Sequence, residues 1–397
     1  MTATAKEGKN VERAAQKRAM QFVLLLGVIS LLADATYEGG RSIAGPYLAV
    51  LGASATTVGL VAGFGELVGY GLRLVSGYVS DRTGKYWSIT FLGYAVNLVA
   101  VPLLALAGHW EIAALLMVLE RTGKAIRTPA RDAMLSHATA EVGRGWGFGL
   151  HEAMDQIGAM LGPLIVAAVF YIRGSYRTGF AVLLAPALLA LGVLVVARRR
   201  YPRPRDLEST VTQVTTRGFQ RRFWLYLAAV ALIAAGYADF PLIAFHLQKV
   251  SSVRAVWIPV FYAVAMGVDA LAALLFGRLF DRTGTSATAV AAVLSAPFAI
   301  FAFARGFVPA LVGVVLWGVG MGAQESIMRA AVADMVPADR RGAAYGVFNA
   351  GYGVAWFAGS ALMGALYDVS IPALMTFSVL AQLASLPLLL TARKKAE

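Results

Sequence analysis

The chain contains two copies of one short motif, separated by about half its length. Residues 77–84 read GYVSDRTG and residues 277–284 read GRLFDRTG, so the second copy follows the first by 200 positions in a chain of 397 residues. A second pair has nearly the same spacing, because the Arg-Gly pair and the small residues of segment 144–162 return in segment 341–359. Repeats at this distance predict two structurally equivalent halves.

Long apolar runs fill the sequence between these motifs. Hydrophobic residues make up 58% of the chain and charged residues 14%, whereas a soluble domain is about one quarter charged. A helix of about 20 apolar residues crosses a bilayer. We count twelve such runs, at residues 20–49, 56–79, 87–107, 111–128, 146–171, 178–197, 222–247, 255–279, 287–304, 309–331, 343–367 and 371–391. The absence of cysteine excludes disulfides and thiolate metal sites.

The predicted fold class is an all-α integral membrane protein, in which twelve transmembrane helices form two pseudo-symmetric six-helix bundles. Residues 198–221 differ from their surroundings, because they carry several arginines, two prolines and a Thr-rich stretch, and we interpret them as a linker. The N-terminal bundle then covers residues 20–197 and the C-terminal bundle residues 222–391. Two tails, residues 1–19 and 392–397, flank the bundles.

Lysine and arginine are distributed unequally across this predicted topology. With both termini on one side, 25 of the 35 basic residues lie in or beside the segments of that side, and five lie in the opposite loops. Loops rich in Lys and Arg remain in the cytoplasm during insertion. Both tails and the linker are therefore predicted to be cytoplasmic, in a multi-pass protein of the plasma (inner) membrane. The same bias explains the net charge of +13 without nucleic acid as a partner.

Charged residues inside the spans are a further constraint, because each one is costly to bury in lipid unless it is paired or hydrated. Spans 3, 6, 9 and 12 contain no internal acid. This period of three predicts that every third helix faces lipid, while the others surround a polar interior. Glycines recur on spans 2, 5 and 11, and small residues let helices approach closely. We therefore expect these three spans to form the surfaces where the two bundles meet.

The repeated motif falls at the same end of spans 2 and 8. Its residues are Gly77, Asp81, Arg82, Gly84, Lys85, Asp281 and Arg282. In spacing, position and duplication they resemble the signature of the major facilitator superfamily, and the resemblance covers essentially the whole chain. It implies a secondary transporter that works by alternating access. It also implies a cytoplasmic gate, in which Asp81 caps the inner end of span 11 and Arg82 and Lys85 pair with nearby acids.

The physical chemistry of this gate agrees with the resemblance, because the helix dipole favours a carboxylate at a helix N-terminus. The alternative is that Arg82 and Lys85 only mark the cytoplasmic side.

A second motif, Gly158-x3-Gly162-Pro163, lies on span 5 and resembles the antiporter signature of family members that export solutes. The family pattern continues with two glycines, where this chain has Val166 and Ala167. The resemblance implies proton-coupled export of a small organic or drug-like solute, with a Gly-Pro corner where the bundles meet. Ordinary close packing with a proline kink is the alternative interpretation of the motif. A proton-coupled uptake symporter is the alternative function.

Six carboxylates in the spans are candidates for carrying the coupled proton. They are Asp34, Glu38, Asp155, Glu152, Asp269 and Glu325. Asp34, Glu38 and Arg41 follow one another at spacings of four and three residues, so they share one helix face. A carboxyl group that is costly to ionise inside the membrane can exchange a proton, but a structural pair between Glu38 and Arg41 is also open. His151 and Asp155 are four residues apart and can touch.

Five aromatic or cationic residues are candidates for contacting the solute. They are Tyr37, Arg41, Arg121, Trp317 and Trp356.

The sequence has no GxxxxGK[ST] phosphate-binding loop and no nucleophile–base constellation, so we expect neither an ATP-driven pump nor an enzyme. We expect no cofactor and no dedicated metal site, although a metal-ion exporter and a non-transporting receptor remain open as alternatives. The expected partners are a small solute, protons and the lipid bilayer, and the chain is expected to act as a monomer.

Overall fold

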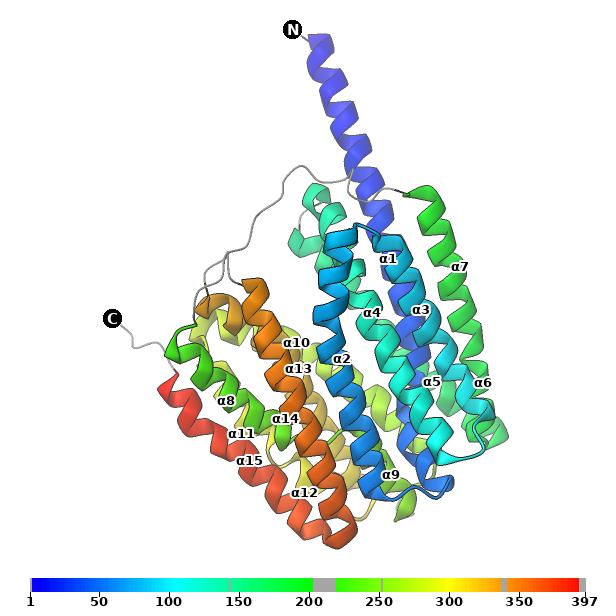
Figure 1. Cartoon of the computed structure of the whole chain (residues 1–397), viewed down its shortest axis with the longest axis vertical. Coiled ribbons are helices and arrows are strands. Elements are labelled where there is room, and N and C mark those ends of the chain that lie inside the picture. The colour runs from blue at the N-terminus through cyan, green and yellow to red at the C-terminus, as the bar shows by residue number, and fades with distance from the viewer. Residues whose placement is uncertain (1, 143, 203–218, 251–252, 337–340, 393–397) are drawn as a thin grey trace.

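The protein is an assembly of long helices in two groups (Figure 1). The computed structural model describes residues 2–142, 144–202, 219–250, 253–336 and 341–392. In these residues the helices are α1 (Thr2–Val50), α2 (Ala55–Thr83), α3 (Tyr86–Leu103), η1 (Leu104–Leu106), α4 (Trp110–Val142), α5 (Arg144–Arg173), α6 (Tyr176–Val182), α7 (Leu184–Arg200), α8 (Arg221–Ala235), α9 (Phe240–Lys249), α10 (Trp257–Thr283), α11 (Ser286–Ser295), α12 (Phe298–Ala302), α13 (Phe307–Met335), α14 (Arg341–Val369) and α15 (Ile371–Thr391).

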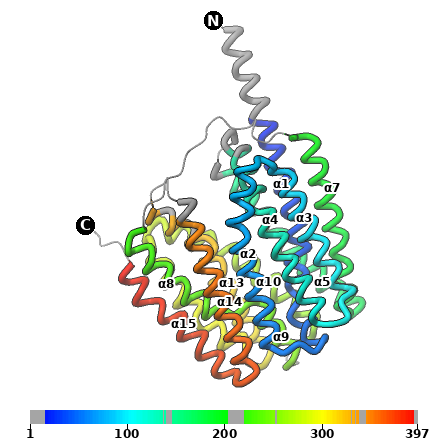
Figure 2. Tube along the Cα trace, in the orientation of Figure 1, coloured from blue at the N-terminus to red at the C-terminus, as the bar shows by residue number. Residues whose placement is uncertain are grey.

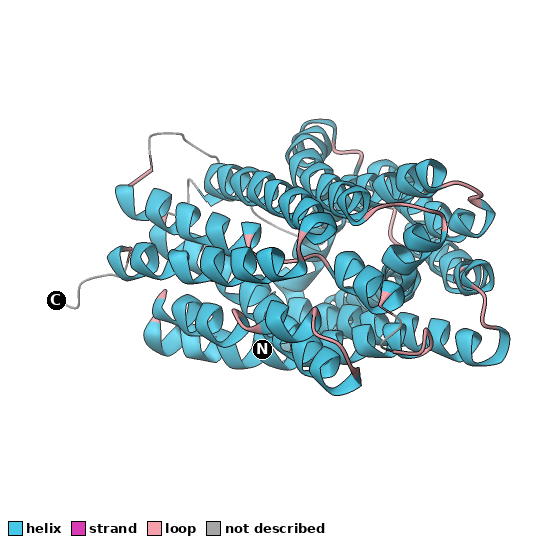
Figure 3. Cartoon of the chain, turned by 90° about the horizontal axis from the view of Figure 1, so that it is seen from below, coloured by secondary structure: helices cyan, strands magenta, loops and turns pink. Residues whose placement is uncertain are grey.

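Helix is the only regular secondary structure of the described residues (Figure 3). Nine of their helical segments are long and apolar enough to cross a bilayer, and a shorter apolar segment spans Ser286–Ala302. The more polar helices α4 and α14 complete the twelve expected crossings. Four crossings consist of two consecutive helices each, namely α3 with η1, α6 with α7, α8 with α9 and α11 with α12. The predicted all-α fold is therefore confirmed. Most of the predicted linker (203–218) and the end of the C-terminal tail (393–397) lie outside the described residues.

The two ends of the molecule are distinguished by their connections. We call the end with connections 83–86 and 283–286 the inner end, and the end with connections 50–55 and 369–371 the outer end. That the inner end faces the cytoplasm is the prediction from the Lys and Arg distribution.

Several helices extend beyond their predicted inner edges, among them α1, α2, α4, α10 and α13. We predicted that span 4 ends at residue 128, but α4 continues to Val142, and Arg131 on this extension pairs with Asp132 at 2.8 Å. Pairing removes much of the penalty for keeping charged residues in a helical bundle. α2 continues to Thr83 instead of residue 79, so the first copy of the repeated motif is the end of a helix rather than a loop.

Glycine ends both copies of the motif for a conformational reason. Gly84 has φ +65° and donates its N–H to Ser80 O at 2.9 Å. Gly284 has φ +60° and donates its N–H to Phe280 O at 2.7 Å. A positive φ is strained for residues with a Cβ, so a helix that ends in this way favours glycine.

The duplication predicted from the sequence is visible in the packing. α5 begins at Arg144 and α14 begins at Arg341, the two Arg-Gly positions of the second repeat. A Cβ on Gly162 of α5 would lie 2.1 Å from Ala35 O of α1. In the other half, a Cβ on Gly359 of α14 would lie 2.1 Å from Ala235 O of α8. Equivalent glycines therefore permit the same close helix contact in both halves.

The two halves meet along α2 with α14, α5 with α10, and α1 with α9 (Figure 2). Spans 2, 5 and 11 were expected at this interface, and the contacts confirm it. Gly59 and Gly63 of α2 face α14 without room for a Cβ. The position predicted for the Gly-Pro corner of α5 is wrong, because Gly158 and Gly162 pack against α1 of their own half. The spacing of the glycines along α5 shows that one helix face consists of small residues, but it does not show which neighbouring helix packs against that face.

The helices expected to face lipid carry exposed apolar side chains. Examples are Leu92 on α3, Leu188 on α7, Val290 on α11 and Leu380 on α15. Apolar surface of this extent suits a bilayer rather than water.

Candidate functional site

A cavity lies in the N-terminal half, between α1, α2 and α4, and α9 of the other half closes it. The volume accessible to the centre of a water molecule is about 50 Å³, which leaves room for several waters. One wall is apolar and includes Leu48, Val61 and Met117. The other wall is charged and is formed by Arg41, Glu66, Glu120, Arg121 and Asp239.

The charged wall is one connected network of ion pairs. Glu66 Oε1 lies 3.2 Å from Arg41 Nη2 and 3.1 Å from Arg121 Nη2, so two guanidinium groups converge on one carboxylate oxygen. Arg121 Nε also lies 3.5 Å from Glu120 Oε2. Arg41 Nη2 further contacts Asp239 Oδ1 at 3.1 Å, which joins the two halves of the protein. We call these five residues the charged cluster. It contains three carboxylates and two guanidinium groups.

Asp239 accepts two further hydrogen bonds within the C-terminal half and lies at a break between two helices. Trp356 Nε1 donates to Asp239 Oδ2 at 2.8 Å and Ser360 Oγ donates to the same oxygen at 2.9 Å. The carboxylate lies at the break between α8 and α9, and its residue is 1% exposed. An irregular backbone inside a membrane domain is tolerated where it lines a cavity, and such breaks commonly lie at binding sites.

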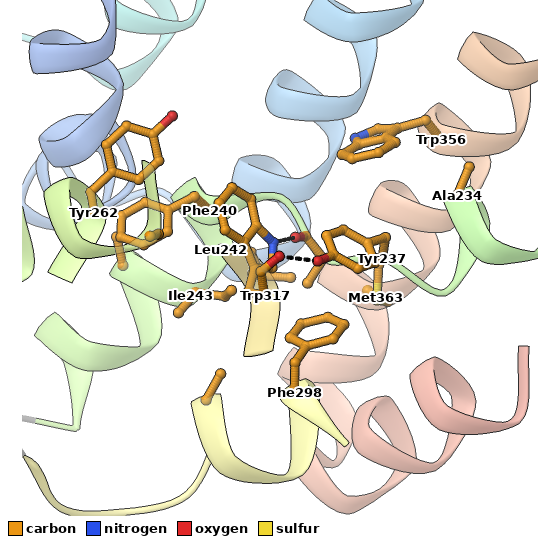
Figure 4. Close-up of a cluster of buried hydrophobic side chains, with 14 of the residues drawn as sticks. Ala234, Tyr237, Phe240, Leu242, Ile243, Tyr262, Phe298, Trp317, Trp356 and Met363 are labelled. Atoms are coloured by element: carbon orange, nitrogen blue, oxygen red, sulfur yellow. Dashed lines mark hydrogen bonds between the residues drawn. The ribbon is translucent and has the colours of Figure 1, made fainter. Parts of the chain in front are cut away.

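The break itself is fixed by aromatic side chains (Figure 4). Trp317 Nε1 donates to Ala238 O at 2.8 Å, and the Tyr237 hydroxyl donates to Trp317 O. Both indole N–H groups therefore bind the α8–α9 junction, Trp317 through Ala238 O and Trp356 through Asp239 Oδ2. Both side chains are buried, at 1% and 2% exposure. Contact of these two residues with a solute stays a prediction.

A row of cations runs along α4 from the charged cluster toward the inner end. Its members are Arg121, Lys124, Arg127 and Arg131, spaced by three or four residues, so that they share one helix face. Lys124 Nζ lies 3.8 Å from Glu38 Oε1 and 4.0 Å from the centre of the Tyr37 ring. Arg127 Nη2 lies 3.8 Å from Asp34 Oδ1. Asp34 and Glu38 therefore each face a cation of their own.

Glu38 also reaches the other half of the protein, because the Tyr262 hydroxyl of α10 donates to Glu38 Oε2. The Glu38–Arg41 pair left open by the sequence is not the arrangement seen here, since Arg41 pairs with Glu66 and Asp239.

The inner end of the row contains the predicted His151–Asp155 contact. His151 Nδ1 lies 3.5 Å from Asp155 Oδ2, and Arg131 Nη1 lies 3.7 Å from the same oxygen. Ser30 Oγ lies 3.0 Å from His151 Nε2 and accepts from Arg131 Nη1 at 3.0 Å. The four groups connect α1, α4 and α5 within the N-terminal half.

The structure thus brings together five of the predicted site residues, Asp34, Tyr37, Glu38, Arg41 and Arg121. Of the other four proton-coupling candidates, Asp155 lies at the inner end of the cationic row, and the remaining three are Glu152, Asp269 and Glu325. Glu152 and Glu325 are exposed, and Asp269 is 2% exposed on α10. Their roles stay predictions.

The predicted cytoplasmic gate is at the inner end. Asp81, Arg82, Lys85, Asp281 and Arg282 are all exposed. Asp81 Oδ1 accepts from the Tyr86 hydroxyl at 3.4 Å, and Arg82 Nη1 donates to the Tyr78 hydroxyl at 3.0 Å. Neither contact reaches α14. Residues 337–340, which precede α14, lie outside the described residues, so pairing of the gate with the inner end of span 11 stays a prediction.

The sequence analysis missed Asp239, Glu66, Glu120, Lys124 and Arg127 as members of the site. Asp239 had a usable signal, because an acid two residues before Pro241 inside an apolar span indicates a broken helix. The spacing of the cations along α4 could also have predicted the row. The ion-pair partners could not be predicted from the sequence, since Arg41 and Asp239, for example, are 198 residues apart.

Comparisons with known proteins agree with this architecture. The family model described as Major Facilitator Superfamily matches residues 23–360 and 286–396. An uncharacterized protein of Mycobacterium tuberculosis is 44% identical over 382 residues, which is 94% of this chain and 93% of that protein. The tetracycline resistance protein, class C, of Escherichia coli is 31% identical over 151 residues, 38% of each chain.

Among solved structures, the nucleoside transporter NupG (D323A mutant) superposes with a TM-score of 0.76 at 13% identity, over 92% of this chain and 99% of that one. At this identity the likeness concerns the fold. The family match over nearly the whole chain, the duplicated helical halves and the full-length relatives lead to one conclusion: the chain belongs to the Major Facilitator Superfamily of membrane transporters.

Proposed function

We propose that the protein exports a small organic or drug-like solute in exchange for protons, by alternating access through the plasma membrane. The observation that carries proton coupling is the imbalance in the charged cluster, which holds three carboxylates for two guanidinium groups. A surplus buried charge is costly. A proton on Glu66, Glu120 or Asp239 removes that surplus.

The cluster also connects proton binding to movement, because the Arg41–Asp239 pair joins the halves. Alternating access requires the halves to rock, so this contact must break when the outer end opens. Protonation of the carboxylate removes its charge and weakens the pair. The bound proton therefore favours opening toward the outer side. An exchanger that takes up protons from the outer side requires this preference.

Export is supported by the partial similarity to the tetracycline resistance protein and by the antiporter-like Gly158, Gly162 and Pro163. The cavity suits an amphipathic solute, since one wall is apolar and the other charged. Tyr37, Arg41 and Arg121 are the side chains that we propose for contact with it. Both termini are proposed to be cytoplasmic, and the working unit a monomer.

The test is transport in proteoliposomes of known orientation, with an imposed pH gradient and tetracycline as the first probe. In inside-out vesicles acidified within, an exporter loads the probe and releases protons. Accumulation in right-side-out vesicles together with protons would instead establish an uptake symporter.

The coupling site is tested with Glu66→Gln, Glu120→Gln and Asp239→Asn, compared with Glu111→Gln, which neutralises an exposed carboxylate outside the charged cluster. We expect at least one cluster variant to lose gradient-driven accumulation while it keeps solute exchange. If all three retain accumulation, the proton is carried elsewhere, and Asp34, Glu38 and Asp155 are the next residues to test.

A further inference from the structure

The outer end of the protein contains a contact that the sequence did not indicate. Asp368, near the end of α14, accepts from Thr56 N at 2.8 Å, from Thr56 Oγ1 at 2.7 Å and from Ala55 N at 3.3 Å. Ala55 is the first residue of α2. A carboxylate of one half thus occupies the N-terminus of a helix of the other half, where the helix dipole favours negative charge.

Asp368 contributes most of the hydrogen bonding at this helix start. The first four N–H groups of a helix have no partner within it. Ser54, the N-cap, serves one of them, because its Oγ accepts from Thr57 N at 3.1 Å. Two others, at Ala55 and Thr56, donate to Asp368. One half of the protein therefore supplies hydrogen-bond acceptors to the helix start of the other half.

α2 and α14 run antiparallel with a register that can be followed along their length. At the outer end a Cβ on Gly364 would lie 2.6 Å from Ala55 O, and farther inward a Cβ on Gly353 would lie 3.0 Å from Tyr70 Cβ. Nearer the inner end, a Cβ on Gly346 would lie 2.9 Å from Leu74 Cδ2.

Continued for two more turns, this register brings Asp81, at the end of α2, level with the start of α14 at Arg341. The two carboxylates are thus placed reciprocally. Asp368 lies in the last turn of α14 and meets the start of α2, and Asp81 lies in the last turn of α2 and comes level with the start of α14.

We propose that Asp368 is the outer latch of the transporter and that it alternates with Asp81 at the inner end. In the present arrangement the outer contact is made, while the described contacts of Asp81 stay within its own half. Opening the outer end separates α2 from α14 there and breaks the contacts of Asp368. Closing the inner end then brings Asp81 to the start of α14.

The test uses the full chain, which has no cysteine, so that paired spin labels can be placed without background. His109 and Arg305 are exposed positions at the outer ends of the two halves, and labels on H109C and R305C report the width of the outer end. Asn keeps an acceptor oxygen but loses the negative charge, which is worth about 0.3–1 kcal/mol at a helix N-terminus, so Asp368→Asn should raise the outer-open to outer-closed ratio about 2-fold to 5-fold. Thr56→Val, which removes one of three donors, should give a smaller change in the same direction.

Two further variants separate a latch from a general structural role. Glu111→Gln removes an exposed carboxylate at the same end that has no ion pair or hydrogen bond among the described contacts, and it should leave the ratio unchanged. Asp81→Asn should shift the ratio in the opposite direction, and the double variant Asp81→Asn/Asp368→Asn should return it toward that of the original chain. The proposal is overturned if Asp368→Asn matches Glu111→Gln, or if the double variant behaves like Asp368→Asn alone.

Discussion

Replacing Gly59 by alanine should hold the outer end of the transporter open. A Cβ at this position of α2 would lie 2.3 Å from Ser360 O of α14, whereas close carbon–oxygen contacts between helices are about 3.3–3.6 Å. Relief requires α2 and α14 to separate by about 1 Å, which is the direction of outer opening. Overpacking of this kind costs about 1–3 kcal/mol. The strain exists only while the outer end is closed, so the outer-open to outer-closed ratio should rise about 5-fold to 150-fold.

The measurement is the same distance distribution between labels at the outer ends of the two halves, combined with the rate of solute exchange. Gly69→Ala is the matched control, because it makes the same substitution on the same helix where a Cβ meets nothing within 4 Å. Any gain in helix propensity from Gly to Ala is common to both variants and to both conformations. An unchanged distance in Gly59→Ala, or an equal change in Gly69→Ala, would show that packing against α14 does not limit closure.

Three other outcomes follow from the contacts described above. Trp317→Phe leaves Ala238 O without its donor, so the thermal unfolding temperature in detergent should fall, in line with a loss of about 1–3 kcal/mol; an unchanged temperature would contradict the role of Trp317 at the helix break. Arg127→Met leaves the buried Asp34 carboxylate without its cation and should cost about 3–5 kcal/mol, and adding Asp34→Asn should recover most of the lost stability. Burial raises the pKa of Asp368, but hydrogen bonds from Thr56 and Ala55 outweigh this effect and hold the pKa below its usual value. Its contribution to outer closure is thus present above the usual carboxyl pKa and lost only in stronger acid, so the outer distance in Asp368→Asn and in the original chain should respond equally to pH between about 5 and 8.

The overall architecture could be predicted from the sequence because the features that determine it are short local patterns that occur in both halves. The two motif copies predicted the two halves, and their terminal glycines end two equivalent helices. Apolar runs predicted the crossings because a segment inside lipid must form all of its backbone hydrogen bonds internally, which a helix does. The inner end of α4 was predicted too early, since a count of apolar residues cannot recognise that arginines such as Arg131 are paired within the bundle.

The site was predicted only in part. Asp34, Glu38 and Arg41 were found because helical spacing places them on one face. Their partners come from other helices, and no local rule connects Arg41 with Asp239 across 198 residues. The same limit explains the misplaced Gly-Pro corner, since a glycine face on α5 fits either half equally well until the packing partner is known.

The contact between Tyr70 and Tyr352 lies about midway along the α2–α14 interface, where a pivot would make the two helices act as a lever. The rings lie 5.2 Å apart and edge to face, roughly 20 Å along α2 from Ala55 and a similar distance from Asp81, at about 1.5 Å per residue. With a fulcrum at this place, a displacement at one end produces a displacement of similar size and opposite sense at the other. Tightening the outer contacts by 1 Å therefore widens the inner mouth by about as much. Smaller side chains at the fulcrum would let both ends move independently, which is the condition under which a carrier leaks.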